Sequence, residues 1–114
     1  LGHLLRDRGY GMMNLGDINK QALAGAVSTG THGTGLGLGS ISTQVEGMTL
    51  VMPDGSLREC SATKDPDLFA AARVSMGALG VIARLDVRLQ PAYKLKLTKQ
   101  PMELDECLAR APER

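Results

Sequence analysis

The chain has 114 residues, the size of one small domain, with 43% hydrophobic residues, 22% charged residues and a formal net charge of +1. This balance argues against a nucleic-acid-binding arm and against a basic membrane-surface helix, because both need clustered Lys and Arg. No apolar run approaches the roughly 20 residues that span a bilayer, no secretory signal peptide is visible, and the first residue is Leu rather than Met, so we expect a piece of a longer protein.

The N-terminal quarter predicts two short helices joined by a loop. Residues 1–8 fit the end of an amphipathic helix, which the following glycine stops. Residues 10–16 contain two glycines and are expected to form a loop. Asp17 or Asn19 can then cap a second helix through residues 20–24.

A glycine-rich loop follows over residues 28–42, where glycine recurs too often for any regular element. From Gln21 to Val45 the chain has no Asp, Glu, Lys or Arg. Glycines leave backbone N–H groups unshielded, and Ser and Thr hydroxyls add neutral donors, a chemistry that suits a phosphate or a flat cofactor. Neither the G-x-G-x-x-G fingerprint nor a Walker A loop is present. The composition alone therefore allows two interpretations of residues 28–42, a ligand-binding loop and a mobile surface loop.

The middle of the chain predicts a β-hairpin and then a helix. Residues 45–52 have strand spacing, residues 57–61 return, and the Pro-Asp-Gly-Ser tetrad at 53–56 is a strong turn signal. Asp65 is placed as the N-cap of the helix, with Pro66 at its first position.

The last third predicts a half-buried strand over residues 81–89, a second alternating segment over 93–97, and a helix that begins within 102–109. The whole reads as one α+β unit. Cys60 and Cys107 are far apart and are expected to be reduced, buried thiols, and the two cysteines and two histidines show no metal-ligand spacing.

Two separated blocks of sequence, in order and in register, carry a family resemblance. The chain resembles the FAD-binding domain of the vanillyl-alcohol-oxidase-like, PCMH-type family, in the branch of sugar-lactone and alditol oxidases that includes L-gulono-1,4-lactone and D-arabinono-1,4-lactone oxidases. The match runs from about Gly11 to Tyr93. The matching segments are Leu15–Ile18, Ala24–Ala26, Ser28–Gly35, Asp65–Arg73 and Gly77–Ile82.

The resemblance implies an α+β PCMH-type FAD-binding subdomain, with a mostly antiparallel sheet and flanking helices. Residues 1–100 would be the second half of the FAD-binding domain, and residues 101–114 would begin the segment toward a substrate cap domain. The implied partners are the upstream half of the domain, the downstream cap, and a lactone or polyol substrate. The implied reaction is hydride transfer from a CH–OH carbon to flavin N5, and the chain alone would be an inactive fragment of a cytoplasmic enzyme, with or without peripheral membrane association.

The same resemblance implies the residues that bind FAD, and it implies no catalytic and no metal-binding residue within the chain. Val81 or Ile82 would present backbone groups to the adenine end, and the other residues would lie along the flavin and its pyrophosphate. His32 is expected to be a loop histidine with a structural role. The implied FAD-binding residues are Ala22, Gly25, Gly30, Thr31, Thr34, Gly35, Leu36, Gly37, Val81 and Ile82.

A non-catalytic binding function is the alternative to an enzymatic one. A small non-catalytic α+β module could use the same Gly/Thr loop to bind an anion or a protein partner. Half of a two-part domain should also expose apolar surface, so we expect the isolated chain to self-associate.

Overall fold

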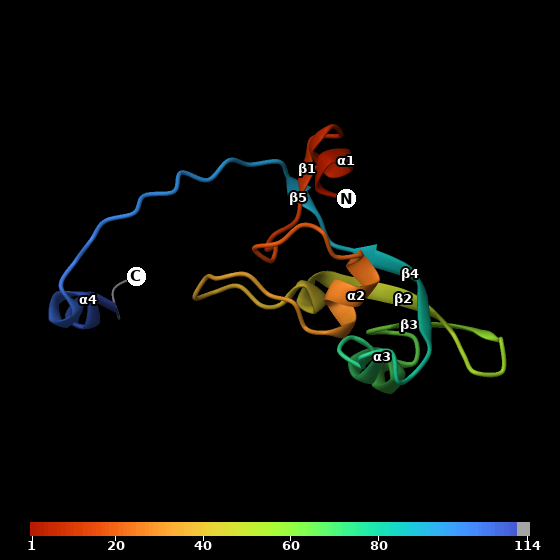
Figure 1. Ribbon diagram of the computed structural model, residues 1–114. Coiled ribbons are helices and arrows are strands. Elements are labelled where there is room, and N and C mark those ends of the chain that lie inside the picture. Colours follow the sequence, from red (N-terminus) through yellow and green to blue (C-terminus); the bar gives the residue numbers. More distant parts are fainter. Residues whose placement is uncertain (112–114) are drawn as a thin grey trace.

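A three-stranded antiparallel sheet forms the centre of the fold in the computed structural model, which describes residues 1–111 (Figure 1). The central strand is β2 (Val45–Val51), which pairs with β3 (Leu57–Ser61) on one side and with β4 (Val81–Val87) on the other. The β2–β4 pairing is interrupted by two register shifts, so the alternation along β4 is less regular than its sequence suggests.

Turn chemistry fixes the β2–β3 hairpin, as the sequence predicts. Gly55 takes a φ of +82° in the turn, a conformation that glycine adopts without strain. The Asp54 carboxylate accepts hydrogen bonds from the Ser56 hydroxyl at 2.6 Å and from the Ser56 N–H at 2.9 Å. These bonds stabilise the ionised carboxylate and lower the pKa of Asp54.

Two helices pack on one face of this sheet and enclose the core. They are α2 (Leu23–Ser28) and α3 (Pro66–Ala72), and the short 3-10 turn η1 (Ile41–Gln44) leads into β2. The opposite face is polar, with Thr49 lying between Glu59 and Arg84 on the neighbouring strands. The buried core residues are Met12, Ala26, Val27, Ile41, Val45, Met48, Leu50, Cys60, Phe69 and Ala72.

Helix α3 begins where the sequence predicts, with Asp65 as its N-cap residue. Pro66 occupies the first turn, which needs no N–H donor from it. Asp65 has a φ of +52° and its side chain makes no capping hydrogen bond; its carboxylate lies 3.7 Å from the guanidinium of Arg58 instead. The helix and the position of Asp65 as its N-cap residue are therefore confirmed, although the Asp65 side chain forms an ion pair and not a capping hydrogen bond.

Helix α2 lies later in the chain than the predicted segment 20–24. It starts after Ala22 and continues through Gly25 to Ser28, and neither Asp17 nor Asn19 caps it. The reason is tertiary packing, because this position buries the next two residues, Ala26 and Val27, in the core. Burial of the apolar face outweighs the local capping signal.

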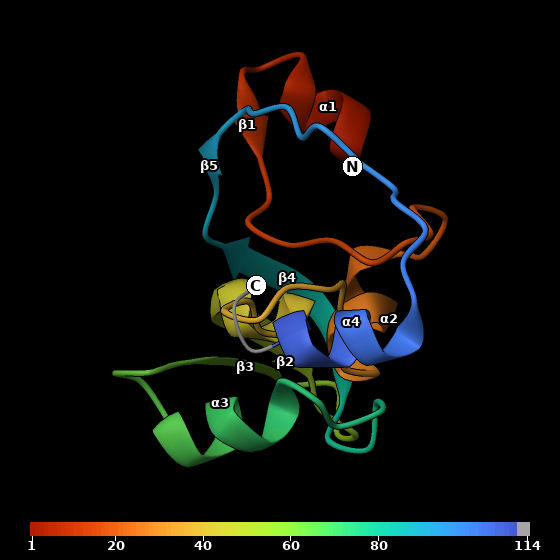
Figure 2. The same cartoon turned by 90° about the vertical axis from the view of Figure 1, so that its left-hand side faces the viewer.

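A second, smaller sheet joins distant parts of the chain. β1 (Tyr10–Gly11) pairs with β5 (Gln90–Pro91), and both views place this pair and the helix α1 (Gly2–Arg6) at the opposite end of the molecule from α3 (Figures 1 and 2). The predicted loop over residues 10–16 therefore begins with a strand pair that only a long-range contact creates.

The C-terminal arm differs from its prediction. Residues 92–103 have no regular secondary structure and lead away from the body to α4 (Leu104–Arg110), so the alternating segment 93–97 forms no strand (Figure 1). Within residues 1–111, no helix is long and apolar enough to cross a membrane. Cys60 is a buried free thiol as predicted, whereas Cys107 on α4 is exposed.

Candidate flavin-binding site

The C-terminus of α2 ends in a Schellman-type cap centred on Gly30. The Thr31 N–H donates to the Ala26 carbonyl oxygen at 2.9 Å, and the Gly30 N–H donates to the Val27 carbonyl oxygen at 3.2 Å. Gly30 has a φ of +67°, which this cap requires and which glycine takes most readily. Gly30 therefore has a structural role that is independent of any ligand.

Polar side chains form a ladder along one exposed edge of α2. The Thr29 hydroxyl donates to the Gly25 carbonyl oxygen at 2.9 Å and lies 3.4 Å from the Thr31 hydroxyl. The Thr31 hydroxyl in turn donates to Gln21 Oε1 at 3.3 Å. Two members of the predicted site, Gly25 and Thr31, thus lie together, and the ladder adds Gln21 and Thr29, which sequence reasoning missed although both belong to the same uncharged run.

Residues 31–40 form a finger that projects from the body beside α2 (Figure 1). Its two ends are joined by the Ile41 N–H, which donates to the Thr31 carbonyl oxygen at 2.8 Å. The predicted residues Thr34–Gly37 lie at the tip, where the Leu36 side chain is 94% exposed. Within residues 1–111, the backbone N–H groups of residues 32–37 have no hydrogen-bond acceptor, so they are available to an anionic or polar ligand.

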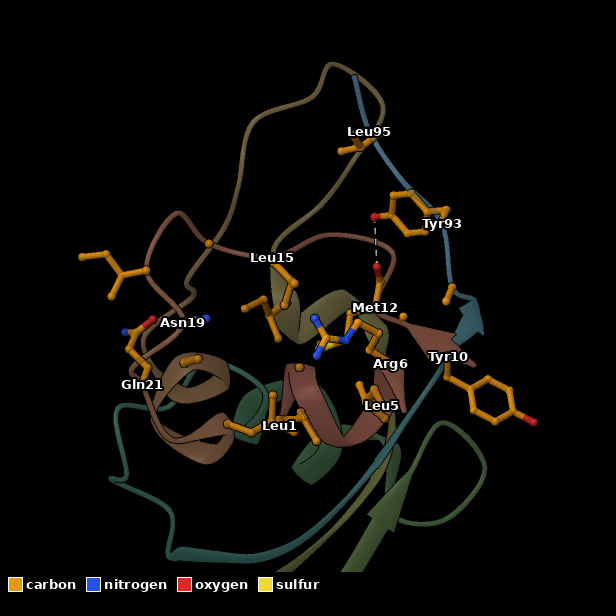
Figure 3. Close-up of a pocket in the computed structure, with 18 residues that line it drawn as sticks. Leu1, Leu5, Arg6, Tyr10, Met12, Leu15, Asn19, Gln21, Tyr93 and Leu95 are labelled. Carbon is orange, nitrogen blue, oxygen red and sulfur yellow. Dashed lines mark hydrogen bonds between the residues drawn. The ribbon is translucent and has the colours of Figure 1, made fainter. Parts of the chain in front are cut away.

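A groove of about 430 Å³ lies between the α1–β1 end of the molecule and α2 (Figure 3). Most of its lining is apolar, and Gln21 and Asn19 supply amide groups on one side of it. Gln21, Leu23 and Ala26 belong to this lining, whereas Ala22 and Gly25 do not. Its apolar walls include Leu5, Met12, Leu15, Leu23, Ile41 and Tyr93.

Helix α2 presents open space at Gly25. A Cβ added at Gly25 would meet no atom within 4 Å, and the residue is exposed. A flat ring can therefore approach the helix backbone closely at this position. Of the predicted residues, Ala22, Gly25, Gly30 and Thr31 are brought together along α2 and its cap.

Val81 and Ile82 lie on a different element, at the start of β4. Val81 is 69% exposed, and Ile82 is half-buried opposite Leu50. The preceding Gly80 has a φ of +136°, and a Cβ there would lie 2.7 Å from the Val51 carbonyl oxygen, so the strand begins with a close backbone approach. Within the described residues, no hydrogen bond links these two residues to the finger or to α2.

Acid–base chemistry is absent from this region of the described chain. The only histidine on the finger, His32, lies with Nδ1 2.8 Å from the Gly33 carbonyl oxygen, a local contact. The pKa of Glu59 is lowered by its hydrogen bond to Lys64, and burial raises the pKa of the Cys60 thiol, but both groups lie on β3. No group of three or more His, Cys, Asp and Glu side chains that could hold a metal ion occurs within residues 1–111.

The donor set of this region fits FAD. Neutral backbone N–H groups on the finger suit a pyrophosphate, the exposed glycine of α2 allows a ring to lie against the helix, and the groove offers an apolar wall with amide groups at its side. The arrangement can bind and orient a cofactor, and the chemistry of a redox reaction would come from the cofactor itself.

Comparison with known proteins identifies relatives of this chain. The FAD binding domain family matches residues 1–61. D-arabinono-1,4-lactone oxidase of Yarrowia lipolytica is 40% identical over 99 residues, which cover 87% of this chain and 19% of that protein. L-gulonolactone oxidase of Mus musculus is 38% identical over 104 residues, which cover 91% of this chain and 24% of that protein.

A solved structure shares the fold. The crystal structure of 6-hydroxy-D-nicotine oxidase from Arthrobacter nicotinovorans matches with a TM-score of 0.72 and 27% identity, over 80% of this chain and 20% of that chain. The expected α+β fold of the PCMH-type subdomain is thereby confirmed. The chain spans only about a fifth of the length of the proteins it matches.

Proposed function

This chain belongs to the FAD-binding domain family, and we propose that its residues 1–100 form the second half of the FAD-binding domain of a flavin-dependent oxidoreductase. The substrate class is a sugar lactone or alditol that is oxidised at a CH–OH group, as the names of the lactone oxidases related to the chain suggest. Residues 101–114 begin the segment toward a cap domain, and positions 112–114 of that segment lie outside the described residues.

One observation carries this proposal, namely that ligand-accessible, uncharged backbone donors lie next to an open helix face. The unpaired N–H groups of residues 32–37 would hold the cofactor's anionic part, and Gly25 would let its ring system approach α2. Bound FAD supplies the hydride acceptor for the oxidation. The residues of this chain bind it, orient it and cover one side of it.

The partners of this half-domain follow from the same proposal. The upstream half of the domain would cover the groove and the exposed face of α2, where Leu15 and Ile18 are exposed. Without that half, the isolated chain should self-associate. We also propose that the parent enzyme is cytoplasmic, with or without peripheral membrane association.

The sharpest test is Gly25→Val in the parent enzyme. The new side chain meets no protein atom within 4 Å, and valine is a better helix former than glycine, so the fold should keep its stability. The same side chain would occupy the space proposed for the cofactor. We therefore expect loss of bound flavin, measured as flavin absorbance per polypeptide after gel filtration, whereas the flavin-free forms of variant and wild type should have the same melting temperature.

A matched control is Ala70→Val, which adds a β-branched side chain to an exposed position of α3. It should retain flavin fully. Retention of flavin by Gly25→Val would refute the placement of FAD on α2. In that case binding of inorganic phosphate or of a protein partner to the finger, measured with the same variant, would favour the non-catalytic module.

Gly30→Val is a poorer test, although Gly30 belongs to the predicted site. Its φ of +67° and its role in the α2 cap mean that valine would strain the helix end whether or not a cofactor binds. Gly35 has a φ of +144°, so the same objection applies to it. Gly37→Val at the finger tip is the better second variant, because a Cβ there meets no atom within 4 Å and its φ lies outside the left-handed region.

A further inference from the structure

Two buried amide side chains hold the base of the finger. Asn14 is 8% exposed and Gln44 is 4% exposed, yet every buried side-chain nitrogen and oxygen in the described chain has a hydrogen-bond partner. Neither residue touches the groove, and neither belongs to the predicted cofactor contacts. The role of Asn14 and Gln44 therefore depends on the segments that their side chains connect.

Asn14 contacts both legs of the finger. Its Nδ2 donates to the Gly39 carbonyl oxygen at 2.9 Å on the returning leg, and its Oδ1 accepts from the Leu15 N–H at 3.0 Å. On the outgoing leg, Gly33 lies so close that an added Cβ would overlap Asn14 Oδ1 and the Leu15 carbonyl oxygen. One side chain thus fixes the separation of the two legs.

Gln44 supports this contact from the end of η1. Its Oε1 accepts from the Met13 N–H at 3.0 Å, and its Nε2 donates to the Asn14 carbonyl oxygen at 2.9 Å. The backbone on either side of the Asn14 side chain is therefore fixed to the segment that follows the finger. We call Asn14 and Gln44 the amide clasp.

We infer that the amide clasp is a positioning device for the cofactor: it holds residues 31–40 in the conformation in which the N–H groups of residues 32–37 face a ligand. The inference rests on the proposed function. Glycines leave the finger with little conformational preference of its own, because they lose the most backbone freedom when they are ordered. Apart from the turn in which the Leu38 N–H donates to the Gly35 carbonyl oxygen at 3.1 Å, the two legs are held from outside the finger, and the clasp contacts both of them.

The test is Asn14→Ala in the parent enzyme, with Gln44→Ala as the milder variant. We expect Asn14→Ala to raise the dissociation constant for added FAD about tenfold, a loss of about 1.4 kcal/mol, and Gln44→Ala to raise it less. In the flavin-free protein, the Ile41 N–H, which bonds to Thr31 across the two legs, should exchange faster with deuterium. The visible circular dichroism of bound flavin should also change.

Phe69→Leu is the control for general destabilisation, because it perturbs the core on α3 and leaves the finger untouched. It should lower the melting temperature without changing FAD affinity or the exchange of the Ile41 N–H. If Asn14→Ala behaves like Phe69→Leu, the clasp is only a core contact and the inference is wrong. Should Asn14→Ala fail to fold, unchanged FAD affinity and Ile41 exchange in Gln44→Ala would overturn it equally.

These outcomes differ from those that would defeat the proposed function. If Gly25→Val keeps its flavin, the cofactor does not lie on α2 and the proposed site fails. If Gly25→Val loses flavin while the clasp variants bind FAD with unchanged affinity, the site stands and the positioning role alone is refuted.

Discussion

Replacing Gly33 by alanine should weaken the fold through a single methyl group. Gly33 lies at the base of the finger, and its Cβ would overlap the backbone oxygen of Leu15 and the side-chain oxygen of Asn14. The Leu15 oxygen is a backbone atom that no side-chain rotation can clear, so the backbone around Gly33 must shift, and the Asn14 side chain must move as well. That movement breaks its bond to the Gly39 carbonyl and its bond from the Leu15 N–H.

The cost can be worked out from these contacts. Overpacking of a close contact costs about 1–3 kcal/mol, and each buried polar group left unpaired costs a further ~1–3 kcal/mol. Partial relaxation reduces the sum, so we expect Gly33→Ala to lower the free energy of unfolding by about 2–4 kcal/mol. The φ of Gly33 lies outside the left-handed region, so this loss is steric and not conformational.

The assay is urea unfolding of the parent protein, followed by far-ultraviolet circular dichroism, beside Gly37→Ala in the same finger. A Cβ at Gly37 meets nothing within 4 Å, so that variant should be as stable as the wild type. Equal unfolding midpoints for Gly33→Ala and Gly37→Ala would show that the finger base is not closely packed. The packing of Gly33 against Asn14 would then be wrong.

Two further predictions concern the hairpin and the cysteines. Lys64 Nζ lies 2.7 Å from Glu59 Oε2 and lowers the pKa of that carboxyl. The ion pair therefore stabilises the folded state at pH values above 4.5, the ordinary pKa of the group, and this stabilisation is lost as the pH falls through the lower pKa of the folded state. Lys64→Met should raise the Glu59 pKa in a carboxyl ¹³C NMR titration, and an unshifted titration would contradict the contact. Burial raises the pKa of the Cys60 thiol, whereas Cys107 is exposed. A thiol reagent at neutral pH should therefore label Cys107 in the native protein, and it should label Cys60 only in urea. Peptide mass spectrometry identifies the labelled cysteine. Native-state labelling of Cys60 would refute its burial.

Elements with local signals were predictable from the sequence. The hairpin depends on a turn whose residues fix its geometry, and α3 depends on a proline at its first turn, so neighbouring residues suffice in both cases. Helix α2 was misplaced because its position is decided by which residues enter the core. The β1–β5 pair could not be predicted, because its partners are far apart in the chain.

In the candidate site, too, some features follow from local sequence and others depend on contacts between distant segments. The composition of the finger is readable from the sequence as an uncharged, glycine-rich run, and the family resemblance singles out Gly25, but the open space at Gly25 is visible only in the structure. The roles of Asn14 and Gln44 are not, because each depends on a hydrogen bond to a residue 25 or more positions away. A lone Asn in a predicted loop gives no sign that it will be buried and bonded to a second segment.

The β1–β5 pair also has a consequence for biosynthesis. The hydroxyl of Tyr93 donates to the Met12 carbonyl oxygen at 3.1 Å across 81 positions of sequence (Figure 3). The Ala92 N–H donates to the Gly9 carbonyl oxygen at 2.9 Å. At a translation rate of about 5–20 residues per second, roughly 4–16 s separate the synthesis of Met12 from that of Tyr93. Throughout that interval β1 has no partner strand, so this side of the groove is completed only after β5 and Tyr93 have been made.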